Sequence, residues 1–85
     1  MASYRLLIKP SAAKELEALP RKDRQRIVAR IRTLVETPRP HGCEKLSGHS
    51  LYRVRQGNYR VLFSVADDNP CVVVIKIGHR SEVYR

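Results

Sequence analysis

Three arginines alternate with apolar residues in a segment that has the pattern of a β-hairpin. Arg53 and Arg55 flank Val54, and Arg60 follows a short turn. Because successive side chains of a strand point to opposite faces, these guanidinium groups are expected to share one face of a sheet, where Lys76 joins them from a later strand. Like charges that face one another destabilise a sheet, whereas arginines bind phosphate bidentately. The pattern favours a phosphate-binding face, and ordinary solvated arginines are the alternative.

The chemistry open to such a face is limited by what the sequence lacks. It has no paired carboxylates at suitable spacing, no glycine-rich phosphate loop and no Ser/His/Asp or Cys/His arrangement. RNA supplies its own nucleophile, the 2′-hydroxyl beside the scissile phosphate, so a metal-free enzyme must orient that group, stabilise the phosphoryl oxygens and move protons. Arginine suits the second task, and Tyr84 or His79 could perform the third. From the residues alone, Tyr84 could equally be a core aromatic that anchors the C-terminus.

The composition indicates a polyanion or an acidic protein as partner. The chain has 85 residues, and 17 Lys and Arg against 8 Asp and Glu give a formal net charge of +9. This length predicts one domain over residues 1–85. Cys43 and Cys71 lie in no metal-binding motif, so we expect reduced thiols, no metal and no cofactor. The sequence has no apolar run long enough for a signal peptide or a membrane span, which predicts a soluble, cytoplasmic protein.

The hydrophobic pattern predicts the elements that must position these residues. Proline and glycine end most of them, and residues 37–50, with few apolar side chains, are expected to form a loop that contains Lys45. The predicted elements are a strand over residues 4–8, a helix over 12–19 capped by Ser11, a helix over 23–35 capped by Asp23, and strands over 51–55, 59–65 and 71–77, the last ended by Gly78.

This order, β-α-α-β-β-β, indicates an α+β fold in which a helical hairpin covers one face of a small, mostly antiparallel sheet. Alternation directs Tyr52 and Val54 toward the helices. In the next strand it directs Val61 and Phe63 the same way. The arginines are then expected on the uncovered face, and the tail residues Arg80, His79 and Tyr84 follow the last strand of the same sheet.

These segments also resemble a known family. The sequence resembles the RelE toxins of bacterial and archaeal toxin–antitoxin pairs over essentially its whole length, most clearly at residues 51–55 (LYRVR), 58–63 (NYRVLF), 74–80 (VIKIGHR) and 81–84 (SEVY). The resemblance implies a metal-independent endoribonuclease, an mRNA interferase that cuts the message in the ribosomal A site and inhibits translation. It also implies neutralisation by a RelB-like antitoxin, with operator DNA bound only through the antitoxin complex.

The resemblance assigns roles position by position. Arg53 and Arg55 match basic strand residues that are often lysines in the family, and Arg60 and Arg80 match arginines that stabilise the phosphoryl charge. Tyr84 matches a terminal tyrosine that stacks on a base or acts as general base. Arginine at positions 53 and 55 cannot give up a proton at neutral pH, which shifts proton transfer to Tyr84 or His79. The residues expected to contact RNA are Arg53, Arg55, Lys76, His79 and Lys45.

Two other functions fit the same fold. The family includes ParE-like toxins, which poison DNA gyrase and lack the catalytic set, and fold alone does not assign activity. A basic nucleic-acid-binding subunit without activity of its own is the third possibility, and salt-sensitive binding without cleavage would favour it.

Overall fold

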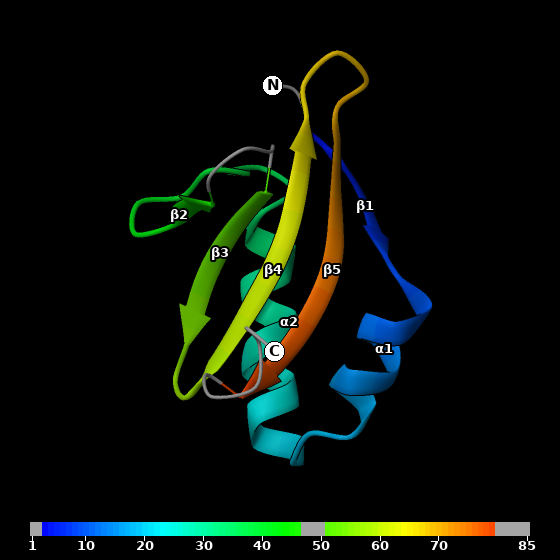
Figure 1. Cartoon of the computed structure of the whole chain (residues 1–85), viewed down its shortest axis with the longest axis vertical. Coiled ribbons are helices and arrows are strands. Elements are labelled where there is room, and N and C mark those ends of the chain that lie inside the picture. Colours follow the sequence, from blue (N-terminus) through cyan, green and yellow to red (C-terminus); the bar gives the residue numbers. More distant parts are fainter. Residues whose placement is uncertain (1–2, 47–50, 80–85) are drawn as a thin grey trace.

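A five-stranded sheet with two helices makes up the fold in the computed structural model, which describes residues 3–46 and 51–79. Along the chain, both helices follow the first strand and precede the other four, as the colours of Figure 1 show. The elements are β1 (Arg5–Ile8), α1 (Pro10–Glu17), α2 (Arg21–Thr33), β2 (Glu44–Leu46), β3 (Leu51–Gln56), β4 (Tyr59–Ala66) and β5 (Cys71–His79). The predicted α+β fold with a helical hairpin is confirmed.

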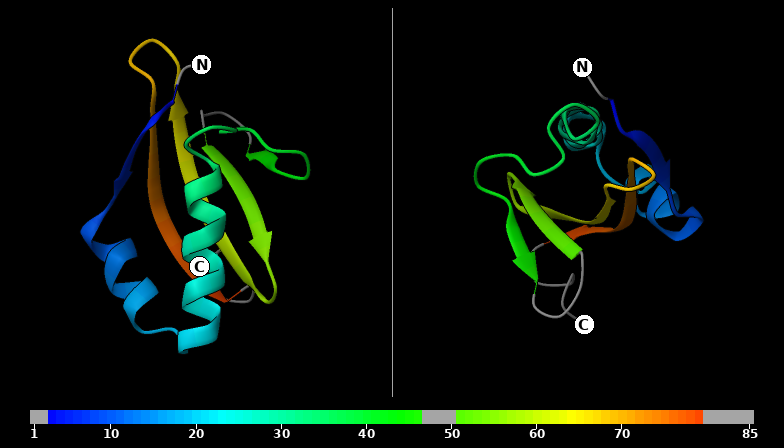
Figure 2. Two further views of the ribbon diagram at one scale, coloured as in Figure 1. Left: turned by 180° about the vertical axis from the view of Figure 1, so that it is seen from behind. Right: turned by 90° about the horizontal axis from the view of Figure 1, so that it is seen from above.

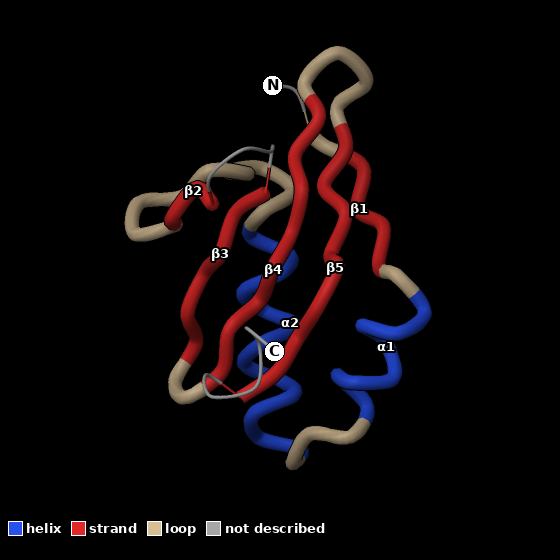
Figure 3. Tube along the Cα trace, viewed as in Figure 1, coloured by secondary structure: helices blue, strands red, loops and turns tan. Residues whose placement is uncertain are grey.

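The strands lie in the order β1-β5-β4-β3-β2, which Figure 3 shows with the strands in red. β3, β4 and β5 form an antiparallel meander, and β2 pairs antiparallel with β3. β1 pairs parallel with β5, and the two helices supply the long crossover that a parallel pair requires. The sheet is therefore mostly antiparallel, as predicted.

Both helices lie toward one face of the sheet, and the opposite face of β3 and β4 carries no helix of the described residues (Figures 1 and 2). α1 packs against β5, and α2 lies behind the sheet in the view of Figure 1. The side chains between the layers are apolar and almost fully buried: Ala12, Ile27, Ile31, Leu34, Tyr52, Val54, Val61, Phe63, Val65, Val72, Val74 and Ile77. The core thus occupies the face that the alternation of β3 and β4 indicated.

Both helices begin earlier than predicted, α1 with proline at its first position and α2 with proline as its N-cap. α1 starts at Pro10, with Lys9 as N-cap, where Ser11 was expected to cap. Proline is well suited to a first helical position, since the N–H that it lacks has no partner there. α2 starts at Arg21 after Pro20, so Asp23 lies in the first turn, where its charge favours the helix dipole. The prediction of Asp23 as N-cap was wrong.

Two strands differ from the prediction. β2 forms in the segment 37–50, which was expected to be a loop, because Glu44, Lys45 and Leu46 pair with the edge of β3. A three-residue strand that depends on a neighbour for its hydrogen bonds leaves no periodic signal in its own sequence. β5 continues through Gly78 to His79, because Gly78 pairs with Arg60 and the ladder persists.

A two-residue turn joins β3 to β4 and fixes their register. Gln56 pairs with Tyr59, which leaves Gly57 and Asn58 as the loop. Gly57 has a φ of 61°, a left-handed conformation that residues with a side chain rarely adopt. Glycine at the first loop position is the preference of a type II′ turn, whose twist matches that of the strands. The turn thereby sets which residues of the two strands face each other.

Candidate anion-binding face

Arg55 and Arg60 face each other directly across the β3–β4 hairpin. The pairs on either side of them in the ladder include Val54 with Val61, whose side chains are buried under the helices. Arg55 and Arg60 therefore project from the other face of the sheet. The side chain of Arg55 is 61% exposed, and Arg60 is half-buried. Two guanidinium groups next to the turn thus share the face that no described helix covers.

Arg53 lies two residues before Arg55 on the same face, but its surroundings differ. Only 10% of its side chain is exposed. Its Nη2 donates to Oε2 of Glu44, and Glu44 is its direct partner across the β2–β3 pair. The other carboxylate oxygen of Glu44, Oε1, lies 3.8 Å from Nη2 of Arg55. One carboxylate from the edge strand therefore contacts two of the predicted arginines.

Lys76 pairs with Leu62 and so starts from the same face, but its side chain reaches α1 and lines the same cavity as Tyr59 and His79. Its Nζ is 3.5 Å from Oε2 of Glu15 in α1, and Oε1 of Glu15 accepts a hydrogen bond of 3.0 Å from the backbone N–H of Ile77. β1 pairs with β5 only as far as Val74, which leaves this N–H for the carboxylate. Lys76 is thus tied to α1 beside the arginine face.

His79 lies on the helix side of the sheet, away from Arg55 and Arg60. It is the partner of Tyr59, and the two rings meet edge to face with their centroids 5.8 Å apart. The Tyr59 hydroxyl donates to Oδ2 of Asp23 at 3.3 Å. With Glu15 and Pro20, the two rings line a cavity of about 470 Å³. The expectation that His79 joins the arginines was wrong. Gly78 is the partner of Arg60, and His79, as the next residue of the strand, points to the opposite face of the sheet.

Lys45 also points away from the arginine face. It pairs with Tyr52, a buried residue of the core, whereas its neighbour Glu44 pairs with Arg53. Since β2 is a strand rather than the expected loop, alternation separates Lys45 from Glu44. Arg80 and Tyr84 lie outside the described residues. The structure therefore brings together Arg53, Arg55 and Arg60, with Lys76 at the margin.

Glu44 is the residue of this face that the sequence analysis missed. It was assigned to a loop, where a lone carboxylate in a basic chain has no expected neighbour. Only one signal could have indicated Glu44. The three residues Glu44–Leu46 match the alternation of β3, and this match places an acid beside Arg53.

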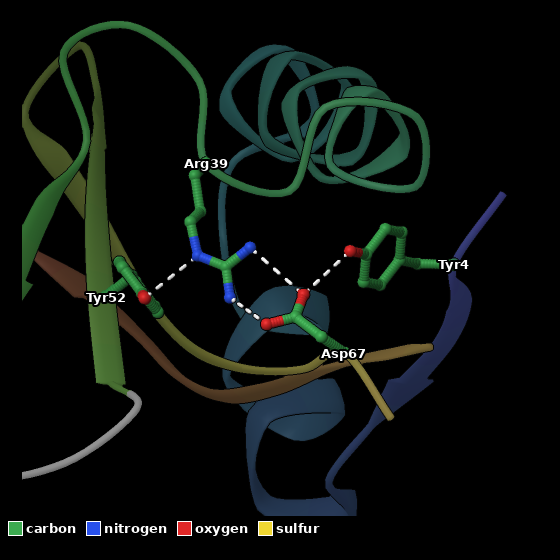
Figure 4. Close-up of polar contacts among 4 residues, drawn as sticks. All are labelled: Tyr4, Arg39, Tyr52 and Asp67. Atoms are coloured by element: carbon green, nitrogen blue, oxygen red, sulfur yellow. Dashed lines mark hydrogen bonds and ion pairs between the residues drawn. The ribbon is translucent and has the colours of Figure 1, made fainter. Parts of the chain in front are cut away.

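A second polar cluster lies at the end of the sheet away from the β3–β4 turn, and Figure 4 shows its residues Tyr4, Arg39, Tyr52 and Asp67. Arg39, in the segment after α2, donates from Nη1 and Nη2 to Asp67 at 3.1 and 2.7 Å and from Nε to the Tyr52 hydroxyl at 2.9 Å. The Tyr4 hydroxyl donates to Asp67 at 2.7 Å. These bonds join the chain before β1, the segment after α2, β3 and the β4–β5 turn. The cluster therefore links segments that are distant in sequence.

The hydrogen bonds of this cluster change the acidity of its members. Arg39 and Tyr4 donate to the carboxylate form of Asp67 and hold the pKa of that carboxyl below its ordinary value. The bond to Asp67 raises the pKa of the Tyr4 phenol, because the phenol must keep its proton to donate. Both shifts follow from one arrangement, in which the carboxylate is the shared acceptor.

Comparison with known proteins shows the family to which this fold belongs. A family model described as the ParE toxin of the type II toxin–antitoxin system parDE matches residues 6–84. RelE of Pyrococcus horikoshii, solved in a RelE–RelB complex, is 30% identical with a TM-score of 0.84, and the match covers 95% of this chain and 99% of that one. The isolated RelE toxin of E. coli is 31% identical with a TM-score of 0.81, covering 96% of this chain and 92% of that one.

A further relative is similar over a shorter stretch. Toxin RelG of Mycobacterium tuberculosis is 35% identical over 34 residues, which span 40% of this chain and 39% of the relative. The matches to the family model and to RelE, in contrast, extend over nearly the whole chain. The fold is that of a small toxin with a helical hairpin over one side of its sheet. The chain belongs to the RelE/ParE superfamily of type II toxin–antitoxin toxins.

Within the described ranges, no helix is long and apolar enough to span a bilayer.

Proposed function

We propose that this toxin is a ribosome-dependent endoribonuclease that cleaves mRNA in the ribosomal A site and so stops translation. The observation that supports this most is the direct opposition of Arg55 and Arg60 on a face that neither described helix covers. Two like charges placed opposite each other oppose folding, and a bound phosphate would offset their repulsion. The proposed substrate is therefore the phosphodiester of a single-stranded message.

The proposed reaction needs no metal. The 2′-oxygen attacks the adjacent phosphorus, the bond from phosphorus to the 5′-oxygen breaks, and the products are a 2′,3′-cyclic phosphate and a 5′-hydroxyl. Arg55 and Arg60 would stabilise the charge that develops on the non-bridging oxygens. Arg80 is proposed to assist them. Because His79 lies on the other face, proton transfer at the 2′- and 5′-oxygens is assigned to Tyr84.

The proposed partners follow from the relatives and from the charge of the chain. RelE was solved with RelB from Pyrococcus horikoshii and from E. coli, and we propose that a RelB-like antitoxin neutralises this toxin. A net charge of +9 suits an acidic antitoxin segment as well as ribosomal RNA. Operator DNA would be bound through the antitoxin complex, and the toxin would act in the cytoplasm.

A second candidate function rests on the family model, which is named for ParE. A ParE-like toxin would bind DNA gyrase without cleaving RNA. The two activities differ in cells, because an interferase stops protein synthesis whereas a gyrase poison damages DNA and leaves messages intact.

The test compares the parent with Arg60→Ala and with Arg5→Ala, which removes the same charge from an exposed position on β1. We expect the parent and Arg5→Ala to arrest protein synthesis in induced cells, measured by incorporation of labelled amino acids. Arg60→Ala should lose this arrest while remaining folded by circular dichroism. Arrest of DNA synthesis with normal protein synthesis in the parent would contradict the proposal and support the gyrase function.

A further inference from the structure

Glu44 occupies a position on the arginine face that a phosphate would also favour. Its two carboxylate oxygens are directed at different guanidinium groups, Oε2 at Arg53 and Oε1 at Arg55. It comes from β2, the short strand on the edge of the sheet, whereas the arginines come from β3. A carboxylate next to a phosphate site repels the ligand, so its presence there weakens the binding of RNA. Some other contribution must explain a carboxylate at this point.

The two arginines that Glu44 contacts differ in exposure. The side chain of Arg53 is 10% exposed, and that of Arg55 is 61% exposed. A buried guanidinium keeps its place only when its charge has a partner, and Glu44 provides one through the β2–β3 pair. Arg55, in contrast, is open to an incoming phosphate. Arg53 and Arg55 are therefore unequal, although alternation alone treats them alike.

We propose that Glu44 is a positioning residue, which holds Arg53 against the sheet and restrains Arg55 from the β2 side, opposite to Arg60. In this arrangement Arg55 and Arg60 contact the phosphate, and Arg53 supports them without touching RNA. The inference rests on the proposed endoribonuclease function and adds a division of labour among its arginines. Fixing a charged group in advance lowers the barrier of the chemical step more than it improves binding.

The first measurement tests the hold of Glu44 on Arg53 without any RNA. Phenylglyoxal modifies accessible arginines, and mass spectrometry locates the products. In the parent we expect rapid modification of Arg55 and slow modification of Arg53. Glu44→Gln, which keeps the shape and removes the charge, should increase the modification rate of Arg53 several-fold. Glu36→Gln, at an exposed carboxylate after α2, serves as the control and should leave both rates unchanged.

The second measurement uses RNA in two forms. Binding is measured with a short single-stranded RNA that has a 2′-deoxynucleotide at every position before a scissile bond, and cleavage with ribosomes programmed with a message. Glu44→Gln should bind the deoxy-substituted RNA as tightly as the parent or more tightly, because a repulsive charge is gone. Its single-turnover cleavage should be roughly 10–100-fold slower, the usual effect of a misplaced catalytic group. Glu44→Asp, which keeps the charge, should restore part of the rate.

The outcomes separate the alternatives. Slower cleavage with Arg53 still protected, together with a flattened pH–rate profile, would assign Glu44 to proton transfer and overturn the positioning role. Unchanged cleavage in Glu44→Gln would overturn it as well. A parent that cuts no message would refute the proposed function itself, whereas the modification of Arg53 would still show whether Glu44 holds it.

Discussion

At the scale of single residues, the arginine face combines an unfavourable pair with a favourable one. Arg55 and Arg60 are cross-strand partners of like charge, and Glu44 compensates Arg53 and lies 3.8 Å from Arg55. A contact of that length between exposed groups contributes little to stability. Glu44 therefore offsets little of the repulsion that the direct opposition of Arg55 and Arg60 introduces, and like charges kept opposite each other are typical of a site that binds an anion.

This balance predicts opposite effects of one substitution on stability and on binding. Arg55→Thr removes the repulsion and introduces a residue with high strand propensity, so the free energy of unfolding in urea should increase by about 0.5 kcal/mol. Binding of single-stranded RNA should weaken, and the dependence of the affinity on salt should decrease.

Arg5→Thr is the matched control, because it removes the same charge from an exposed strand position that faces no arginine in the described ladder. It should not stabilise the protein. A destabilised Arg55→Thr would show that the pair is not repulsive in the folded protein.

At the scale of elements, the β3–β4 hairpin determines which arginines meet. Its two-residue turn depends on Gly57, whose φ of 61° an L-residue adopts only with strain. A one-residue change of register would move Arg60 to the helix side. The turn therefore contributes to the site as directly as the arginines do.

We expect Gly57→Ala to reduce the free energy of unfolding by about 1 kcal/mol, because alanine lacks the freedom of glycine at positive φ. Gly57→Asn should lose less, since asparagine tolerates the left-handed region better. Urea unfolding followed by circular dichroism measures both. Equal stability of the parent and Gly57→Ala would mean that the turn does not require glycine.

The elements also show what the sequence could predict. Strict alternation in β3 and β4 was enough to place Arg53, Arg55 and Arg60 on one face, because each strand has a buried side that fixes its orientation. β2 and its Glu44 could not be predicted, since three residues carry no period and their strand exists only through pairing with β3. His79 was misplaced for a related reason. Gly78 is predicted to end the strand, and only the continued ladder with β4 shows on which face His79 lies.

At the scale of the whole molecule, the two ends of the sheet carry different groups of polar side chains. One end carries the arginine face beside the hairpin turn, and the other carries the Arg39–Asp67 cluster, which ties together four separate segments of the chain (Figure 4). This cluster contains a carboxylate shared by a guanidinium and a phenol. It is expected to influence stability, and to do so in a pH-dependent way.

The lowered pKa of Asp67 determines how the stability of the protein changes with pH. Its pKa is below the ordinary value of 3.8, so the cluster stabilises the folded protein above that pH and the contribution disappears as the pH falls through the lowered pKa. The unfolding free energy of the parent, measured from about pH 6 to about pH 3, should therefore fall more steeply than that of Asp67→Asn. Asp68→Asn, in the same turn, should follow the parent. Parallel curves for the parent and Asp67→Asn would contradict this role.

Cleavage of RNA by the arginine face leaves cut ends in the message that primer extension detects. A message is translated in a cell-free system with the purified toxin, with its Arg60→Ala variant or with neither, and the 5′ ends of the fragments are mapped. We predict new ends within the translated region in the presence of the parent, absent when translation is blocked and absent with Arg60→Ala. An intact message on translating ribosomes in the presence of the folded parent protein would contradict RNA cleavage by this face.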